Sequence, residues 1–129
     1  MSLIVGIVLP HEVVLMADSY TNTGGLRNTV GPKLDHIGPF AVAHCGTVKD
    51  WYLYRSLVKK DDPLIDPSFH IGVTKRMREL AADREGEGTV NLQLLLANGR
   101  SLFYAAGEGQ IYPCTQLAAA GDSWPHIEL

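Results

Sequence analysis

The chain has 129 residues, of which 46% are hydrophobic and 19% charged, and its formal net charge is −3. A chain of this length and composition is expected to form a globular domain with a real buried core, so a disordered protein is excluded. Its slight excess of acidic residues argues against a nucleic-acid binder, because phosphate contacts need a clustered basic surface.

The first part of the chain is predicted to be β-structure. Four largely apolar segments are expected to be strands: residues 3–9, 13–17, 29–37 and 40–45. The first two flank a Pro10-His11-Glu12 turn and therefore predict a buried hairpin. The polar segment 18–25 contains a glycine pair and is expected to be a loop, and Gly46 is expected to end the fourth strand.

The hydrophobic period then changes to that of two amphipathic helices. Thr47 is a good N-cap residue with Asp50 three residues later as its capping-box partner, which predicts a helix over 48–60. An Asp-Pro pair at the start predicts a second helix over 66–85. Because both helices carry an apolar stripe, we expect them to lie antiparallel on one face of a sheet.

Strands return after the helices. Four short segments are expected to be strands: residues 90–96, 102–106, 110–114 and 117–120. Asn98-Gly99 predicts a hairpin between the first two. Because strands occur in runs instead of alternating with helices, the fold class is predicted to be α+β, a sandwich of largely antiparallel sheets with two helices on one face. Residues 1–129 are interpreted as a single domain.

Membrane insertion, export and metal binding are not expected. No apolar run approaches the ~20 residues of a membrane-spanning helix, and the N-terminal residues lack the pattern of an export signal. Cys45 and Cys114 are interpreted as buried hydrophobic residues in a reducing compartment, so a cytoplasmic protein is expected. The five histidines form no metal-ligand pair, and neither a metal nor a cofactor is expected.

The second residue carries the main chemical signal. Ser2 follows Met1, and aminopeptidases readily remove methionine before so small a residue. Removal places a hydroxyl and a free α-amine on one residue, and an α-amine with a pKa of about 8 is partly neutral at pH 7. Ser2 is therefore a candidate nucleophile that carries its own general base. Taken alone, a serine at position 2 is more often an ordinary residue.

Three further residues stand where they can support such a nucleophile. Asp18 ends an apolar strand and can orient an amine, and Lys33 lies in an otherwise uncharged stretch where burial tunes its proton affinity. Gly46 precedes a helix N-terminus, where a backbone N–H can face a developing oxyanion. Each also has an ordinary interpretation: a turn cap, a solvated lysine and a strand end.

Four segments together resemble the beginning of a proteasome-type subunit: Ser2–Gly6, Val13–Ser19, Lys33–Leu34 and Ala43–Thr47. This family comprises proteasome β subunits and related bacterial HslV-like ring proteases, which are N-terminal nucleophile (Ntn) hydrolases. The order and spacing of the nucleophile, aspartate, lysine and glycine are similar to those of the family. The two helices after the glycine and the returning strand pair also fit, so the resemblance extends along the whole chain.

The resemblance implies an Ntn-type amide hydrolase of the threonine-type endopeptidase family. Ser2 would attack the peptide bond, with its own amine as the base. Asp18 and Lys33 would hold that amine in its reactive state and lower the proton affinity of the hydroxyl. The backbone N–H of Gly46 would bind the oxyanion.

The resemblance also implies roles for residues around this centre. Asp122 and Ser123 occupy the position of a turn that supports the nucleophile. Thr21 and Asn22 fall where the family pairs with an extended peptide substrate. His44 falls near the floor of the pocket that receives the side chain before the cleaved bond.

A peptide or unfolded polypeptide is the implied substrate, and like subunits in a ring are the implied partners, with a regulatory ATPase as a further one. The chain departs from the family because it has serine instead of threonine as the nucleophile. Family members also continue for several tens of residues with further helices, so an incomplete domain that lacks a C-terminal helical layer is expected. Two other interpretations stay open: a non-catalytic subunit or remnant with an assembly role, and a stand-alone amidase.

Overall fold

The computed structural model describes residues 3–18, 20–23, 26–29, 33–58, 66–85, 90–121 and 124–128. The strands in these ranges are β1 Leu3–Val8, β2 Val13–Ala17, β3 Tyr20–Thr23, β4 Leu26–Thr29, β5 Leu34–Ile37, β6 Phe40–Gly46, β7 Leu92–Asn98, β8 Ser101–Ala106, β9 Ile111–Cys114, β10 Leu117–Gly121 and β11 Trp124–Glu128. The helices are α1 Val48–Leu57 and α2 Phe69–Glu85. Neither helix combines the length and the apolar character needed to cross a membrane.

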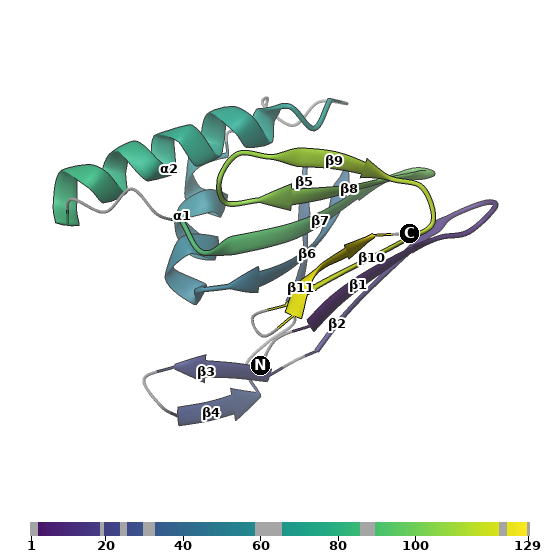
Figure 1. The fold of residues 1–129 in the computed structure, drawn as a ribbon, viewed down its shortest axis with the longest axis horizontal. Helices are drawn as coiled ribbons and strands as arrows, with labels where there is room; N and C mark the ends of the chain where they lie inside the picture. The colour runs from purple at the N-terminus through teal and green to yellow at the C-terminus, as the bar shows by residue number, and fades with distance from the viewer. Residues whose placement is uncertain are drawn as a thin grey trace.

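Two antiparallel sheets stack on each other, and the helices lie on the outer side of the larger one (Figure 1). The larger sheet has five strands in the order β5-β6-β7-β8-β9, and the smaller has four in the order β11-β10-β1-β2. A separate pair is formed by β3 and β4. The predicted α+β class, with two helices on one face of a largely antiparallel sandwich, is therefore confirmed.

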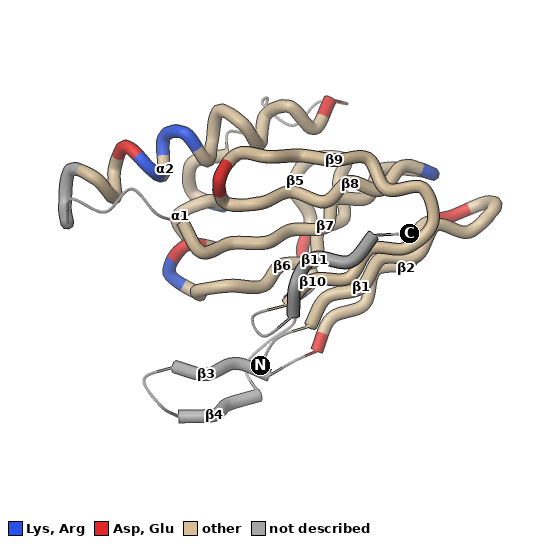
Figure 2. Tube along the Cα trace, viewed as in Figure 1, with Lys and Arg blue, Asp and Glu red and all other residues tan. Residues whose placement is uncertain are grey.

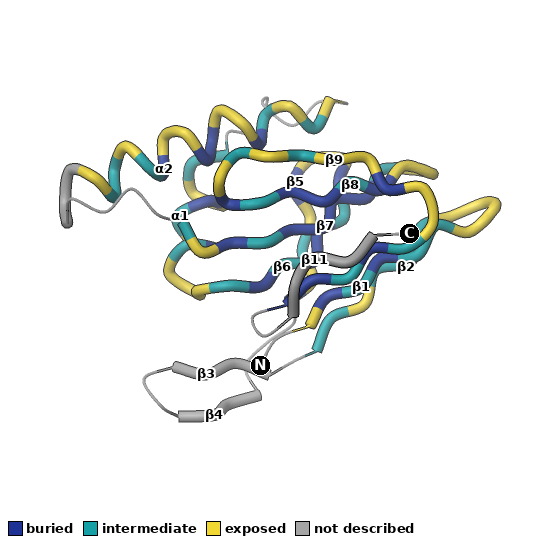
Figure 3. The backbone as a smooth tube through the Cα atoms, in the orientation of Figure 1, coloured by how far each residue is buried: buried dark blue, intermediate teal, exposed yellow. Residues whose placement is uncertain are grey.

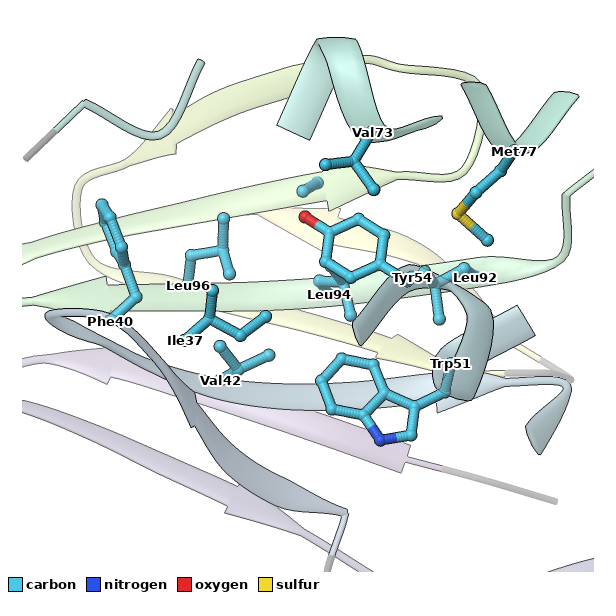
Figure 4. Close-up of a cluster of buried hydrophobic side chains, with 11 residues drawn as sticks. Ile37, Phe40, Val42, Trp51, Tyr54, Val73, Met77, Leu92, Leu94 and Leu96 are labelled. Carbon is cyan, nitrogen blue, oxygen red and sulfur yellow. The ribbon is translucent and has the colours of Figure 1, made fainter. Parts of the chain in front are cut away.

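One part of the core lies between the larger sheet and the helices (Figure 4). Trp51 and Tyr54 of α1 and Val73 and Met77 of α2 are buried there against strand side chains such as Leu94. These helix residues recur at three- and four-residue spacing, which places them on one face of each helix. Burying an aromatic or aliphatic side chain of this size contributes roughly 1.5–3 kcal/mol each, so this stripe secures the helices to the sheet.

A second part of the core lies between the two sheets. Ala43, Cys45 and Leu95 of the larger sheet pack there against Ile4 and Ala120 of the smaller one. Alternation along a strand explains this division, because successive side chains point to opposite faces of a sheet. The central strand β7 is buried on both faces and reads as an almost continuous apolar run. Cys45 and Cys114 are buried, as expected.

Figure 3 shows that burial concentrates on the facing strands, while the outward side of α2 is exposed. The strands also carry few charged residues, whereas α2 carries residues of both signs (Figure 2). On the outer face of the smaller sheet, Val5 and Ile7 of β1 lie opposite Met16 and Val14 of β2, and Met16 is exposed. The outer face of the smaller sheet is therefore apolar along β1 and β2.

Pairing between strands accounts for several differences between expectation and structure. The predicted loop over 18–25 contains β3, and the third predicted strand, over 29–37, contains β5 and only the last residue of β4. Antiparallel pairing of β3 with β4 satisfies the backbone groups of this polar segment, which side-chain polarity alone does not reveal. Strand β11 was not predicted and pairs with β10.

The ends of the helices and one turn also differ from the expectations. Thr47 is the N-cap residue of α1 by position but its side chain makes no capping hydrogen bond. Asp66 accepts a hydrogen bond from the N–H of Ser68 at 2.9 Å, so it caps a turn and α2 begins only at Phe69. In the β7–β8 hairpin the two-residue loop is Gly99-Arg100, since Asn98 still pairs with Ser101.

Candidate active site

An ion pair between Asp18 and Lys33 joins one end of the smaller sheet to one end of the larger sheet. Asp18 follows β2, Lys33 precedes β5, and the Lys33 Nζ donates to Asp18 Oδ1 at 2.6 Å. The lysine side chain is only 7% exposed and that of the aspartate 35%. A buried ammonium needs an anionic partner, and a charge-assisted hydrogen bond is stronger than a neutral one. The pair therefore holds a positive charge in a fixed place.

Asp18 is also attached to the beginning of β1. Its Oδ2 accepts a hydrogen bond from the backbone N–H of Leu3 at 3.2 Å. In return the backbone N–H of Asp18 donates to the carbonyl oxygen of Leu3 at 3.1 Å. Leu3 is the residue that follows Ser2, so the carboxylate is tied to the chain next to the candidate nucleophile. Ser2 itself lies outside the described residues.

Gly46 ends β6 in a conformation that requires glycine. Its φ is +120°, and a Cβ built on it would lie 2.3 Å from the carbonyl oxygen of Asn91. The neighbouring Thr47 donates its N–H to that oxygen at 3.0 Å. No larger residue fits between the end of β6 and the segment before β7, because backbone atoms cannot move aside as a flexible side chain can.

The direction of the Gly46 N–H follows from the hydrogen bonds on either side of it. His44 donates its N–H to the carbonyl oxygen of Lys33 at 2.9 Å, toward β5. Successive N–H groups along a strand point to alternate sides, so those of His44 and Gly46 point the same way. The Gly46 N–H is thus directed to the side of β6 on which Lys33 lies.

The segment around Gly46 is braced from α1. Asp50 in the first turn of the helix accepts a hydrogen bond from the backbone N–H of Asn91 at 2.9 Å. The expected capping-box bond to Thr47 is therefore replaced by a tertiary one. This contact joins α1 to the segment before β7 and holds the Asn91 carbonyl against Gly46.

His44 occupies a partly buried position next to Lys33. Its ring stacks on that of Trp51, with 3.8 Å between centroids and 10° between planes. Burial lowers the pKa of His44 to about 4, against a smaller opposing effect of the Asp35 carboxylate. The imidazole is therefore neutral at pH 7, with one nitrogen that donates and one that accepts.

Several candidate residues lie outside this description. Ser2, Asp122 and Ser123 are not among the described residues, and for Thr21 and Asn22 only the backbone is described. That backbone is part of β3, opposite Asn28 and Arg27 of β4. Within the described ranges, no three His, Cys, Asp or Glu side chains gather in a metal-binding arrangement.

Sequence reasoning missed the polar contacts made by α1. Arg55 pairs with Asp35 at 2.7 Å, Asp50 reaches Asn91, and Trp51 supports His44. The spacing of Trp51 and Tyr54 marked an apolar stripe. Which strand residues meet this helix depends on tertiary packing, and no short motif signals it.

The fold is similar to those of three solved proteins. Anbu (ancestral beta-subunit) from Yersinia bercovieri matches 94% of this chain with a TM-score of 0.72 and 19% identity. BPH from Thiobacillus denitrificans matches 93% with a TM-score of 0.71 and 16% identity, and HslV from Trypanosoma brucei matches 93% with 0.70 and 16%. The chain has the fold of these proteins.

The chain covers a different fraction of each of these proteins. The chain covers 61% of the Anbu chain, 72% of the BPH chain and 71% of the HslV chain. A second BPH structure, in complex with epoxomicin, matches with a TM-score of 0.72 and 19% identity. No model of a known protein family matches the sequence, and no curated protein does. The resemblance to proteasome-type proteins is thus supported at the level of the fold.

Proposed function

We propose that this chain is a proteasome-type peptidase subunit in which Ser2, after removal of Met1, cleaves peptide bonds. One observation carries the proposal. The Asp18 carboxylate bonds both the Lys33 ammonium and the backbone N–H of Leu3, the neighbour of Ser2. A charged pair is thereby bonded to the residue that follows the proposed nucleophile in the sequence, and the fold shared with Anbu, BPH and HslV supports the same function.

The proposed reaction begins with attack of the Ser2 hydroxyl oxygen on the carbonyl carbon of the peptide bond. The hydroxyl proton passes to the α-amine of the same residue. The positive charge of Lys33 stabilises negative charge that develops on the hydroxyl oxygen, and Asp18 keeps the ammonium in place. The Gly46 N–H donates to the oxyanion of the tetrahedral intermediate.

Collapse of that intermediate breaks the C–N bond. The α-ammonium returns its proton to the leaving amine, and the acyl group stays on Ser2 as an ester. Water then attacks the ester with the α-amine again as the base, which releases the acid and regenerates the hydroxyl. No metal or cofactor takes part in this sequence.

The surrounding residues are proposed to position the nucleophile and the substrate. Asp122 and Ser123 support the nucleophile, and His44 lies near the side-chain pocket. Thr21 and Asn22 pair with an extended peptide by strand addition. In the part of the chain that the structure describes, β3 pairs with β4 along one edge, which supports addition of a peptide along the other.

The proposed partners follow from the same function. Like subunits assemble into a ring in the cytoplasm, unfolded polypeptide is the substrate, and a regulatory ATPase delivers it. Light scattering of the purified chain tests the assembly, because a ring has several times the mass of one chain. A monomer that still cleaves a small amide would instead indicate a stand-alone amidase.

Mass spectrometry of the purified chain tests the catalytic proposal. The expected result is loss of Met1 and, after incubation with epoxomicin, a covalent adduct on Ser2. Ser2→Ala should remove the adduct, and Lys33→Met should slow its formation by roughly 10²-fold or more. Lys49→Met removes the same charge from an exposed position on α1 and is the matched control. Retention of Met1 would refute the proposal and favour a non-catalytic subunit. An adduct that persists in Ser2→Ala would refute Ser2 as the nucleophile.

A further inference from the structure

A second polar cluster lies next to the Asp18–Lys33 pair, on the helix side of the larger sheet. His44 lies opposite Lys33 across the β5–β6 pair, since Leu34 and Ala43 are the adjoining partners. Asp35 lies two residues after Lys33 and therefore on the same face. Arg55 reaches Asp35 from α1 with an N–O distance of 2.7 Å. Three different elements thus bring polar groups to one side of the candidate catalytic lysine.

Each carboxylate oxygen of Asp35 already accepts one hydrogen bond in this cluster. Asp35 Oδ1 accepts from the backbone N–H of His36 at 2.8 Å, and Asp35 Oδ2 accepts from Arg55 Nη1. The charge of Asp35 is balanced by Arg55, just as that of Asp18 is balanced by Lys33. Since the formal charges cancel in pairs, the spare hydrogen-bonding capacity decides which ligand group fits.

Donors in the cluster have capacity to spare. A guanidinium has five N–H groups, and the described residues engage Arg55 through one ion pair. Its side chain is 56% exposed and that of Asp35 is 25% exposed, so an incoming group meets the guanidinium first. The neutral His44 ring, held by Trp51, adds a further N–H, and the described side chains give its nitrogens no hydrogen-bond partner.

We propose that Arg55 and His44 form a donor subsite beside the Asp18–Lys33 pair that selects peptides with a carboxylate side chain next to the cleaved bond. A carboxylate has only acceptors, and its hydrogen bonds to a guanidinium are charge-assisted. A lysine side chain would have to displace Arg55 from Asp35. The subsite rests on the proposed function for its position relative to the cleaved bond, but its chemistry is that of the described residues.

Four peptides that differ only in this side chain, Glu, Gln, Leu or Lys, test the subsite. Cleavage is measured as kcat/KM with the full chain, and binding as Kd with Ser2→Ala, so the two readouts are independent. The Glu peptide is expected to be favoured over the Leu peptide by about tenfold in both, because an aliphatic side chain leaves the donors unmatched. Gln should be intermediate and Lys the poorest.

Two variants assign the selectivity to named groups. Arg55→Gln should reduce the Glu-to-Leu ratio to near one. His44→Phe keeps an aromatic ring to stack on Trp51 but removes the donor, and should reduce the ratio several-fold. Arg76→Gln removes one positive charge from an exposed position on α2 and should not change it. Thermal unfolding of each variant accompanies the measurement, and Arg55→Met, which also removes the charge, replaces Arg55→Gln if that variant unfolds.

The outcomes separate the subsite from the catalytic proposal. Cleavage without preference for Glu, or an equal effect of Arg55→Gln and Arg76→Gln, overturns the subsite and leaves the peptidase function in place. Selective, Arg55-dependent binding without any cleavage supports the subsite and overturns the peptidase function. Absence of both binding and cleavage overturns both.

Discussion

Replacing Gly46 by alanine is expected to destabilise the fold, whereas the same replacement at Gly72 is expected to stabilise it. At Gly46 the added methyl would lie 2.3 Å from the Asn91 carbonyl oxygen, and the φ of +120° is unfavourable for any residue with a Cβ. Overpacking costs roughly 1–3 kcal/mol and a strained backbone conformation a further 1–2 kcal/mol or so, about 2–5 kcal/mol together.

Alanine substitutions at two other glycines separate the energetic cost of a steric clash from the cost of the backbone conformation. Gly99 has a φ of +63° but open space around its Cβ position, so alanine there should cost only about 1 kcal/mol. Gly72 lies inside α2 with nothing within 4 Å of the added methyl, and alanine should stabilise the helix by roughly 0.5–1 kcal/mol. The three variants should therefore rank in a fixed order of unfolding free energy.

Thermal or urea unfolding of the three variants measures this order. For a chain of this length, 1 kcal/mol corresponds to roughly 3–5 °C, so Gly46→Ala should unfold on the order of 10 °C below the parent chain. Gly72→Ala should unfold a few degrees above it. A Gly46→Ala chain as stable as Gly72→Ala would refute the argument from the Asn91 carbonyl.

The remaining predictions concern charge, pH and surface. Asp18→Asn is expected to lower the unfolding free energy by about 1–3 kcal/mol, which urea titration measures, because Lys33 loses its anionic partner. Burial lowers the pKa of His70 to about 4 from an unfolded value near 6.5, so its stabilising contribution is complete above pH 6.5 and is lost toward pH 4. His70 alone should account for a fall of about 3 kcal/mol in unfolding free energy over that window, so the total fall should be clearly smaller in His70→Asn. Hydrophobic-dye binding by the isolated chain should decrease in Met16→Glu, which breaks the apolar outer face of the smaller sheet; equal dye binding would contradict that surface.

The fold could be predicted from the sequence wherever hydrophobic pattern and turn chemistry agree. The β1–β2 hairpin, the strand ending at Gly46 and both helices follow from period and from residues such as Pro10 and Thr47. The predictions failed where pairing decides the structure. Strand β3 consists mainly of polar residues, and β11 comes shortly after Gly121, so neither sequence predicts a strand. Pairing with a partner strand is what makes each of them extended.

Less of the candidate site than of the fold could be predicted from the sequence. Asp18, Lys33 and Gly46 were noticed as residue types in unusual places, but their distances depend on how two sheets stack. His70 shows the same limit, since nothing near it in the sequence signals its environment. In the structure one ring nitrogen lies 3.0 Å from the Tyr54 hydroxyl, and the other donates to the Ala106 carbonyl at 2.7 Å. These contacts join α1, α2 and β8, which are distant in sequence.

The topology itself explains why the candidate residues meet at one end of the sandwich. In an antiparallel pair the end of one strand lies beside the beginning of the other. Asp18 at the end of β2 therefore lies beside Leu3 at the beginning of β1, and Lys33 before β5 lies beside the end of β6. The Asp18–Lys33 bond joins these two pairs across the sheets. The start of β1 at Leu3 consequently lies next to the Asp18 carboxylate that holds the buried Lys33 ammonium.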